Sequence, residues 1–136
     1  MSAFKRETGG PVQSYHNNTE VVIVRATGGG AATALTLASA SDRCVATITN
    51  RGVGQYRINF RDVPAGTWLG MAYTAHGTAD TIADAKVVTE VRGSYDSANS
   101  RVDFTVANLD ATPALEDLAT TEGLTLFLYW AATAKP

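Results

Sequence analysis

From about residue 55 onward, apolar and polar residues alternate along short runs, and turn-forming Gly, Asp and Asn residues close each run. The clearest alternation lies in segment 55–61, where the apolar members are Tyr56, Ile58 and Phe60 and the polar members are Arg57, Asn59 and Arg61. Because successive side chains of a β-strand point to opposite faces, this pattern predicts a strand with one apolar and one polar face. The apolar face has to pack against another sheet, which favours a β-sandwich or a closed barrel over a catalytic α/β scaffold.

Further strands are predicted by short runs of the same kind on both sides of this segment. They span residues 21–24, 43–49, 68–76, 86–95, 101–108 and 124–131. Residues 31–40 suit either a helix or a strand, and the Ala-Leu-Thr-Leu sequence at 34–37 favours a short strand. Segments 86–95 and 101–108 flank the turn-forming residues 96–100 and predict a hairpin. The spacing of these strands predicts an all-β fold, an antiparallel β-sandwich.

Two of these runs are apolar without alternation. Val21-Val22-Ile23-Val24 is a β-branched series that suits a buried strand. Segment 124–131 is apolar almost throughout, which predicts burial on both faces or a contact with another subunit.

One short helical insert is expected before the last strand. Thr112 suits an N-cap and Pro113 a first helical position for a helix over 114–119, and Gly123 ends the segment. Glu116 and Asp117 are then favourable charges in the first helical turn. They point to different sides of the helix and therefore do not converge as a glycosidase pair does.

The beginning of the chain differs from the rest in composition. Residues 1–19 are mostly polar or turn-forming and keep neither a strand nor a helix period. We expect an N-terminal arm over 1–19 that is extended unless a partner orders it, followed by one sandwich domain over 20–136. The length of 136 residues suits a single domain.

Charge and cysteine usage narrow the class of protein. The chain has 11 basic and 13 acidic residues, a net charge of -2, and no concentrated basic stripe. Neither nucleic acid nor a membrane is therefore an expected partner. Cys44 is the single cysteine and cannot form an intrachain disulfide. The N-terminus lacks the apolar stretch of a signal peptide, so we expect a soluble protein that is not secreted.

Few residues suggest catalysis or metal binding. His76, Asp80 and Asp84 are close in sequence, but metal sites usually need more donors and supporting partners. The two histidines and Cys44 complete no recognisable hydrolase or thiol-enzyme arrangement, and Cys44 in a strand pattern is typical of a small buried hydrophobe. We therefore predict no enzymatic activity, no metal and no cofactor.

Three segments carry a resemblance to a known family. Segment 52–60, Gly-Val-Gly-Gln-Tyr-Arg-Ile-Asn-Phe, resembles the turn and strand of small virion proteins of tailed phages. Residues 93–98 with 101–106 are similar to a hairpin of those proteins, and residues 124–130 to their closing apolar strand. The resemblance covers roughly residues 50–130. It implies a jelly-roll-like sandwich, similar to trimeric C1q/TNF-like modules, on the outside of a phage head as a decoration or cement protein.

A decoration protein binds the major capsid protein on the outer surface of the virion and stabilises the assembled shell by mass action. For capsid contact we expect the arm residues Phe4, Lys5, Arg6 and Tyr15. For self-association as a dimer or trimer, we expect the last-strand residues Phe127, Tyr129 and Trp130.

The same resemblance implies an alternative, a head-fibre or fibre-tip module that recognises a glycan or host receptor. Such a module would use exposed aromatic side chains and the loop from His76 to Asp84. The aromatic candidates are Trp68, Tyr73, Tyr95, Tyr129 and Trp130. Aromatic residues serve cores and interfaces more often than sugar-stacking platforms.

Overall fold

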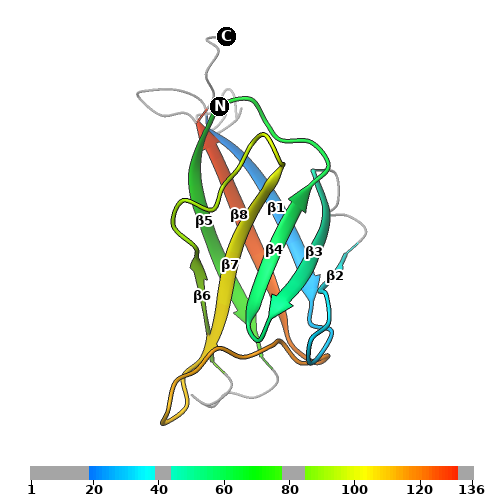
Figure 1. Cartoon of the computed structure of the whole chain (residues 1–136), viewed down its shortest axis with the longest axis vertical. Helices are drawn as coiled ribbons and strands as arrows, with labels where there is room; N and C mark the ends of the chain where they lie inside the picture. The colour runs from blue at the N-terminus through cyan, green and yellow to red at the C-terminus, as the bar shows by residue number, and fades with distance from the viewer. Residues whose placement is uncertain (1–18, 39–43, 78–84, 132–136) are drawn as a thin grey trace, which may run out of the picture.

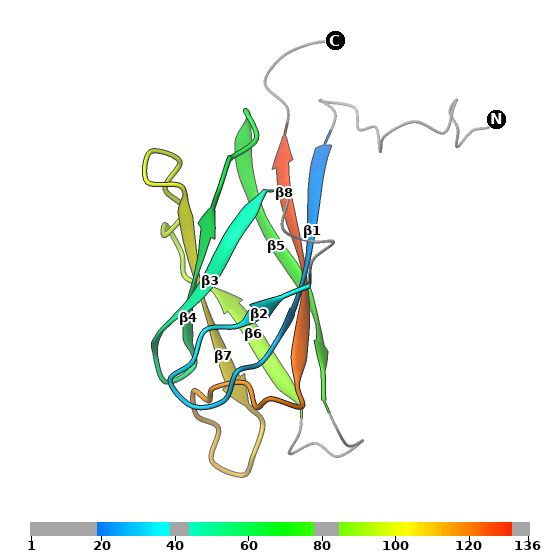
Figure 2. The same cartoon turned by 90° about the vertical axis from the view of Figure 1, so that its right-hand side faces the viewer.

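The structure is a computed structural model that describes residues 19–38, 44–77 and 85–131. The strands are β1 (Thr19–Thr27), β2 (Thr36–Leu37), β3 (Val45–Gly52), β4 (Gln55–Phe60), β5 (Thr67–His76), β6 (Lys86–Glu90), β7 (Arg101–Asn108) and β8 (Gly123–Ala131). They form two four-stranded sheets, which we call sheet I (β2-β1-β8-β5) and sheet II (β3-β4-β7-β6). Figure 1 and Figure 2 show the sheets as two facing layers. The predicted antiparallel β-sandwich is confirmed.

The first and last strands lie side by side in sheet I. β1 pairs with β8 from Thr19 opposite Ala131 to Thr27 opposite Gly123. In sheet II, β6 and β7 pair from Lys86 opposite Asn108 to Glu90 opposite Phe104, which confirms the predicted hairpin. β6 ends at Glu90, five residues before the predicted end of that strand at residue 95.

Alternate residues of both sheets build one core between the layers. Tyr56 and Ile58 of β4 are fully buried, whereas Arg57 between them lies opposite Asp103 of β7. The largest contribution from sheet I comes from β8, whose Leu124, Leu126, Leu128 and Trp130 are at most 1% exposed. The period-two alternation that predicts strands therefore also identifies the core side of β4 and β8.

The turn between β3 and β4 requires glycine at its second position. Gly54 has a φ of 65°, in the left-handed region. A Cβ at this residue would lie 2.5 Å from the carbonyl oxygen of Val106 and 2.6 Å from the amide nitrogen of Glu116. The predicted turn over 50–54 is confirmed, although strand pairing continues to Gly52.

The predicted helix over 114–119 is wrong, because this segment runs extended along the edge of β7. Leu115 forms a β-bridge with Ala107, and the amide of Glu116 donates to the carbonyl of Val106 at 3.0 Å. The amide of Asn108 donates to the carbonyl of Ala114 at 2.9 Å. A single helical turn is costly to nucleate, and these bonds to β7 satisfy the backbone without one.

Segment 34–37 is extended, as the strand interpretation predicts. β2 covers Thr36 and Leu37, and the amide of the preceding Leu35 donates to the carbonyl of Ile48 in β3 at 3.0 Å. The bridge between Leu35 and Ile48 thereby links the segment of β2 in sheet I to β3 in sheet II, and Figure 2 shows these two strands near each other.

Candidate functional site

The outward side of sheet I carries a cluster of exposed apolar residues. Val21 and Ile23 of β1 are 38% and 52% exposed. They lie opposite Tyr129 and Phe127 of β8, whose side chains are half-buried. Leu69 is 56% exposed at the bulge of β5, where the next residue pairs with Tyr129. We call Val21, Ile23, Leu69, Phe127 and Tyr129 the apolar face.

Strand alternation explains why these side chains point outward. Leu126, Leu128 and Trp130 of β8 are buried in the core, so Phe127 and Tyr129 between them face the other way. The run from Val21 to Val24 suits a buried strand, and it does lie in β1, but only one side of it is buried, because Val24 is fully buried while Ile23 is half exposed. A continuous β-branched run has no alternation, and so its sequence cannot distinguish a core-facing residue from an outward-facing one.

The outward side of sheet II is polar and internally paired. Arg57 forms a bidentate contact with Asp103, with Nε to Oδ1 at 2.7 Å and Nη2 to Oδ2 at 3.0 Å. These hydrogen bonds, together with the nearby positive charge, hold the pKa of Asp103 below its usual value. Asn59 donates to Thr47 Oγ1 at 3.0 Å on the same sheet. The two outer surfaces therefore differ in kind, and an exposed apolar cluster is the one that marks an interaction site.

Three aromatic residues of the suggested glycan platform pack inside the molecule. The rings of Trp68 and Tyr95 stack at 4.8 Å with an interplanar angle of 3°, and Trp130 meets both edge-on. The indole nitrogen of Trp130 donates to the Tyr95 hydroxyl at 3.0 Å, and that of Trp68 to Glu90 Oε2 at 2.7 Å. These residues anchor one end of the core and are not an exposed stacking surface.

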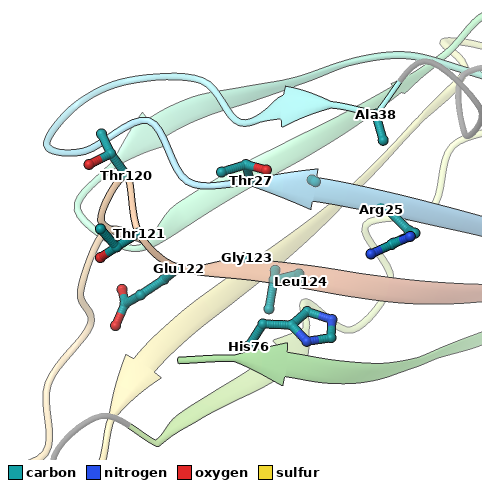
Figure 3. Close-up of a pocket in the computed structure, with 10 residues that line it drawn as sticks. Arg25, Thr27, Ala38, His76, Thr120, Thr121, Glu122, Gly123 and Leu124 are labelled. Atoms are coloured by element: carbon teal, nitrogen blue, oxygen red, sulfur yellow. The ribbon is translucent and has the colours of Figure 1, made fainter. Parts of the chain in front are cut away.

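A pocket lies at the opposite end of β8. Its lining residues are Arg25, Ala26, Thr27, Ala38, His76, Thr120, Thr121, Glu122, Gly123 and Leu124. In Figure 3, Arg25 and His76 approach Leu124 from the two strands that flank β8. His76 Nε2 lies 2.9 Å from Thr125 Oγ1. Guanidinium, imidazole and hydroxyl groups are suited to hydrogen-bonding a small polar ligand.

A buried ion pair joins the two sheets beside this pocket. Lys86 Nζ lies 3.0 Å from Glu122 Oε2, and the two side chains are 4% and 7% exposed. The other carboxylate oxygen of Glu122 accepts a hydrogen bond from the amide of Ala119 at 2.9 Å. Lys86 belongs to sheet II and Glu122 directly precedes β8, so the pair joins the two layers.

The described residues show little reactive chemistry. Burial raises the pKa of the Cys44 thiol to about 11, and the carboxylates of Asp62 and Glu20 act in the same direction. Cys44 is half-buried and donates to the carbonyl of Asp62 at 2.9 Å. Within residues 19–38, 44–77 and 85–131, no three His, Cys, Asp or Glu side chains gather as metal ligands would. The same segments contain no helix of the length and apolarity that crossing a membrane takes.

The expected capsid-contact residues Phe4, Lys5, Arg6 and Tyr15 lie outside the described residues, as do Asp80 and Asp84 of the loop after His76. Their roles stay predictions.

Of the residues expected to mediate self-association, Phe127 and Tyr129 belong to the apolar face, whereas Trp130 lies fully buried in the core of its own chain. Self-association through the last strand stays a prediction. Sequence reasoning missed Val21, Ile23 and Leu69 as surface residues. The β-branched run at 21–24 predicts a strand there but does not show that Val21 and Ile23 face outward.

No protein-family model, curated protein or solved structure matches this chain. The resemblance to virion proteins of tailed phages therefore rests on sequence motifs. What the fold and the site define is a class, a β-sandwich with one polar outer surface and one apolar outer surface.

Proposed function

We propose that this protein is a phage capsid decoration protein, which attaches to the outside of the assembled head through the apolar face and stabilises the shell. The observation that supports the proposal is the exposed cluster centred on Ile23 and Phe127, on a molecule whose other outer surface is polar. The sequence motifs supply the virion context. A sheet face is flat and rigid, and it suits a folded protein surface better than a small molecule.

The size of the apolar face indicates a second point of attachment. β1, β8 and β5 are 9, 9 and 10 residues long. At the usual strand spacing and rise, the whole outer surface of these three strands covers about 14 by 30 Å, or roughly 400 Å² in plan, and the apolar face is only part of it. A stable interface takes about 800 Å² per partner. Residues 1–18 directly precede β1 and supply the remaining contact in our proposal.

The charge of the apolar face indicates which kind of capsid surface can bind it. None of the five residues of the apolar face is charged. The complementary surface is therefore apolar at its centre. A protein that binds the assembled shell and not the free subunit shifts the assembly equilibrium toward the shell, and repeated copies multiply the effect.

Co-sedimentation with capsid shells that lack their decoration protein tests the proposal. Ile23→Glu places a charge on the apolar face at a half-exposed site, and we expect it to weaken shell binding at least tenfold. Val53→Glu is the matched control, because Val53 is 63% exposed in the turn between β3 and β4. A deletion of residues 1–18 should also weaken binding, while β1 from Thr19 onward is kept. If the wild-type protein never sediments with shells, or if Ile23→Glu binds as the wild type does, the proposal fails.

A second candidate function, a fibre-tip module that binds a glycan, is favoured by the pocket in Figure 3. On a glycan array, this function predicts binding that His76→Ala removes and that Ile23→Glu leaves unchanged. Removal of residues 1–18 should leave glycan binding intact, which separates this function from capsid attachment.

A further inference from the structure

β5 is a long edge strand, and no described strand pairs with its outer side. It has ten residues, and in the part of the chain that the structure describes it pairs with β8 and with no other strand. An unpaired edge presents free N–H and C=O groups to any other strand, and proteins usually protect it with Pro, Lys, other charges or a bulge. Residues 70–76 contain no Pro, Lys, Arg, Asp or Glu, and the bulge of β5 lies before them, at Leu69 between Trp68 and Gly70. Figure 1 shows β5 at the margin of sheet I.

Tyr73 gives independent evidence that this edge is available to a partner. The register places Tyr73 opposite Leu126, whose side chain is fully buried in the core. The side chain of Tyr73 therefore leans toward the inner side of sheet I, yet it is 37% exposed. The neighbouring edge strand of sheet II, β6, has only five residues. An aromatic residue on the core side thus remains open at the edge of the sandwich.

We propose that β5 pairs with β5 of a second copy of this chain, antiparallel about a two-fold axis at Tyr73. Such pairing joins the two four-stranded sheets I into one continuous sheet. A two-fold axis perpendicular to the sheet places one residue opposite itself. The longest symmetric stretch that avoids the bulge is 70–76, and its centre is Tyr73. Met71 then faces Ala75 of the second copy, and Ala72 faces Thr74 of the second copy.

The charge and backbone of segment 70–76 are compatible with pairing to the same segment of a second copy. Residues 70–76 carry no formal charge at pH 7 with His76 neutral, so two copies meet without like-charge repulsion. Seven residue pairs in an antiparallel ladder form about six to eight backbone hydrogen bonds, close to the roughly ten of a typical protein interface. The two Tyr73 rings come together on the inner side, where aromatic pairs are favourable. This dimer does not depend on the proposed capsid attachment, and it leaves both apolar faces open on the same side of the joined sheet.

Two double variants test the pairing and its register. Ala72 and Thr74 are exposed, so substitutions there leave the core unchanged. Ala72→Lys with Thr74→Lys places Lys opposite Lys at both pairs, whereas Ala72→Lys with Thr74→Glu places Lys opposite Glu. Analytical ultracentrifugation should find the wild type at twice the 14.3 kDa of the chain. We expect the Lys/Lys variant to dissociate at least tenfold more readily, and the Lys/Glu variant to remain dimeric. A wild type that is monomeric at every concentration, or two variants that associate equally, overturns the proposal.

Chemical cross-linking provides a second readout that does not depend on those charges. In a Cys44→Ser background, Tyr73→Cys places two thiols directly opposite each other across the proposed axis, and a short bismaleimide should join the copies. Ala98→Cys is the control, because Ala98 is exposed in the connection between β6 and β7, away from this edge. Cross-linking of Tyr73→Cys and not of Ala98→Cys supports the pairing. Failure of Tyr73→Cys to cross-link in a folded dimer overturns it.

Discussion

The indole nitrogen of Trp130 donates a hydrogen bond of 3.0 Å to the hydroxyl of Tyr95, and this bond connects the two layers of the sandwich. Trp130 belongs to β8 of sheet I, and Tyr95 lies in the connection between β6 and β7 of sheet II. Since Trp130 is fully buried, its N–H group has no access to water. The Tyr95 hydroxyl therefore holds the β6–β7 connection to sheet I and also satisfies a buried hydrogen-bond donor.

Tyr95→Phe should lower the free energy of unfolding by about 1–3 kcal/mol, because it leaves the buried Trp130 N–H group without an acceptor. Urea unfolding measures the change. Tyr129→Phe removes the same hydroxyl from an outward-facing residue and should change stability by less than about 0.5 kcal/mol. Equal effects of the two variants would contradict the role of the Trp130–Tyr95 bond.

Lys86→Met should destabilise the protein by about 3–5 kcal/mol, since it leaves the Glu122 carboxylate buried without its cation. In the double variant Lys86→Met with Glu122→Gln, the charge is removed as well, while an amide oxygen remains to accept from Ala119. We expect this double variant to be more stable than Lys86→Met alone. A double-mutant cycle in urea measures the difference, and strict additivity would refute a coupled pair.

Asp117 should make stability depend on acid pH. Burial raises its pKa, but hydrogen bonds from the amides of Ala32 and Gly54 and from the Asn50 side chain outweigh burial, and the net pKa is lowered from 3.8. A lowered folded-state pKa stabilises the fold fully above the unfolded-state value, and this stabilisation is lost as the pH falls through the folded-state value. Asp117→Asn should therefore cost about 1–2 kcal/mol at pH 7 and less below the folded-state pKa. Thermal unfolding of the wild type and of Asp117→Asn at pH 7 and at acid pH measures the two costs. An equal cost at the two pH values would refute the link between Asp117 ionisation and stability.

Cys44 should react slowly with alkylating reagents. With its pKa at about 11, the folded protein holds little thiolate at neutral pH. Compared with the ordinary value of 9.0, the thiolate fraction at neutral pH falls roughly 100-fold. Iodoacetamide labelling followed by mass spectrometry should show slow modification of the folded chain and fast modification in urea. Fast labelling of the folded chain would contradict the raised pKa.

The strands that alternate cleanly could be predicted from sequence, because their period is local information. Alternation identifies segment 55–61 and the hairpin around residues 96–100. β4 and β7 follow these predictions closely, whereas β6 ends at Glu90, five residues early. The conformation of segment 112–119 could not be predicted from sequence. Its local signals favour a helix, but its backbone hydrogen bonds go to β7, which precedes it in the chain. Tertiary partners decided the conformation there.

The role of Asp117 shows the same limit at a single residue. Next to Glu116 it has the composition of a helix N-terminus, but in the fold its carboxylate accepts from Ala32, Asn50 and Gly54, more than 60 positions away along the chain. The apolar face was partly predictable for a related reason. Segment 124–131 signals either double-sided burial or a contact, and only its neighbours in sheet I show that Phe127 and Tyr129 face outward.

The pairing of Thr19 with Ala131 has a practical consequence for engineering. Because these two positions are direct neighbours across a ladder, a short Gly/Ser connector could join them without disturbing either strand. New chain ends could then be opened at the exposed Val53 beside Gly54, giving a circular permutant with the same layers. Cargo fused directly before Thr19 or after Ala131 leaves from the pole where β1 begins and β8 ends, while cargo at the permuted ends leaves from the tip of the β3–β4 hairpin. The same scaffold therefore offers two directions for display.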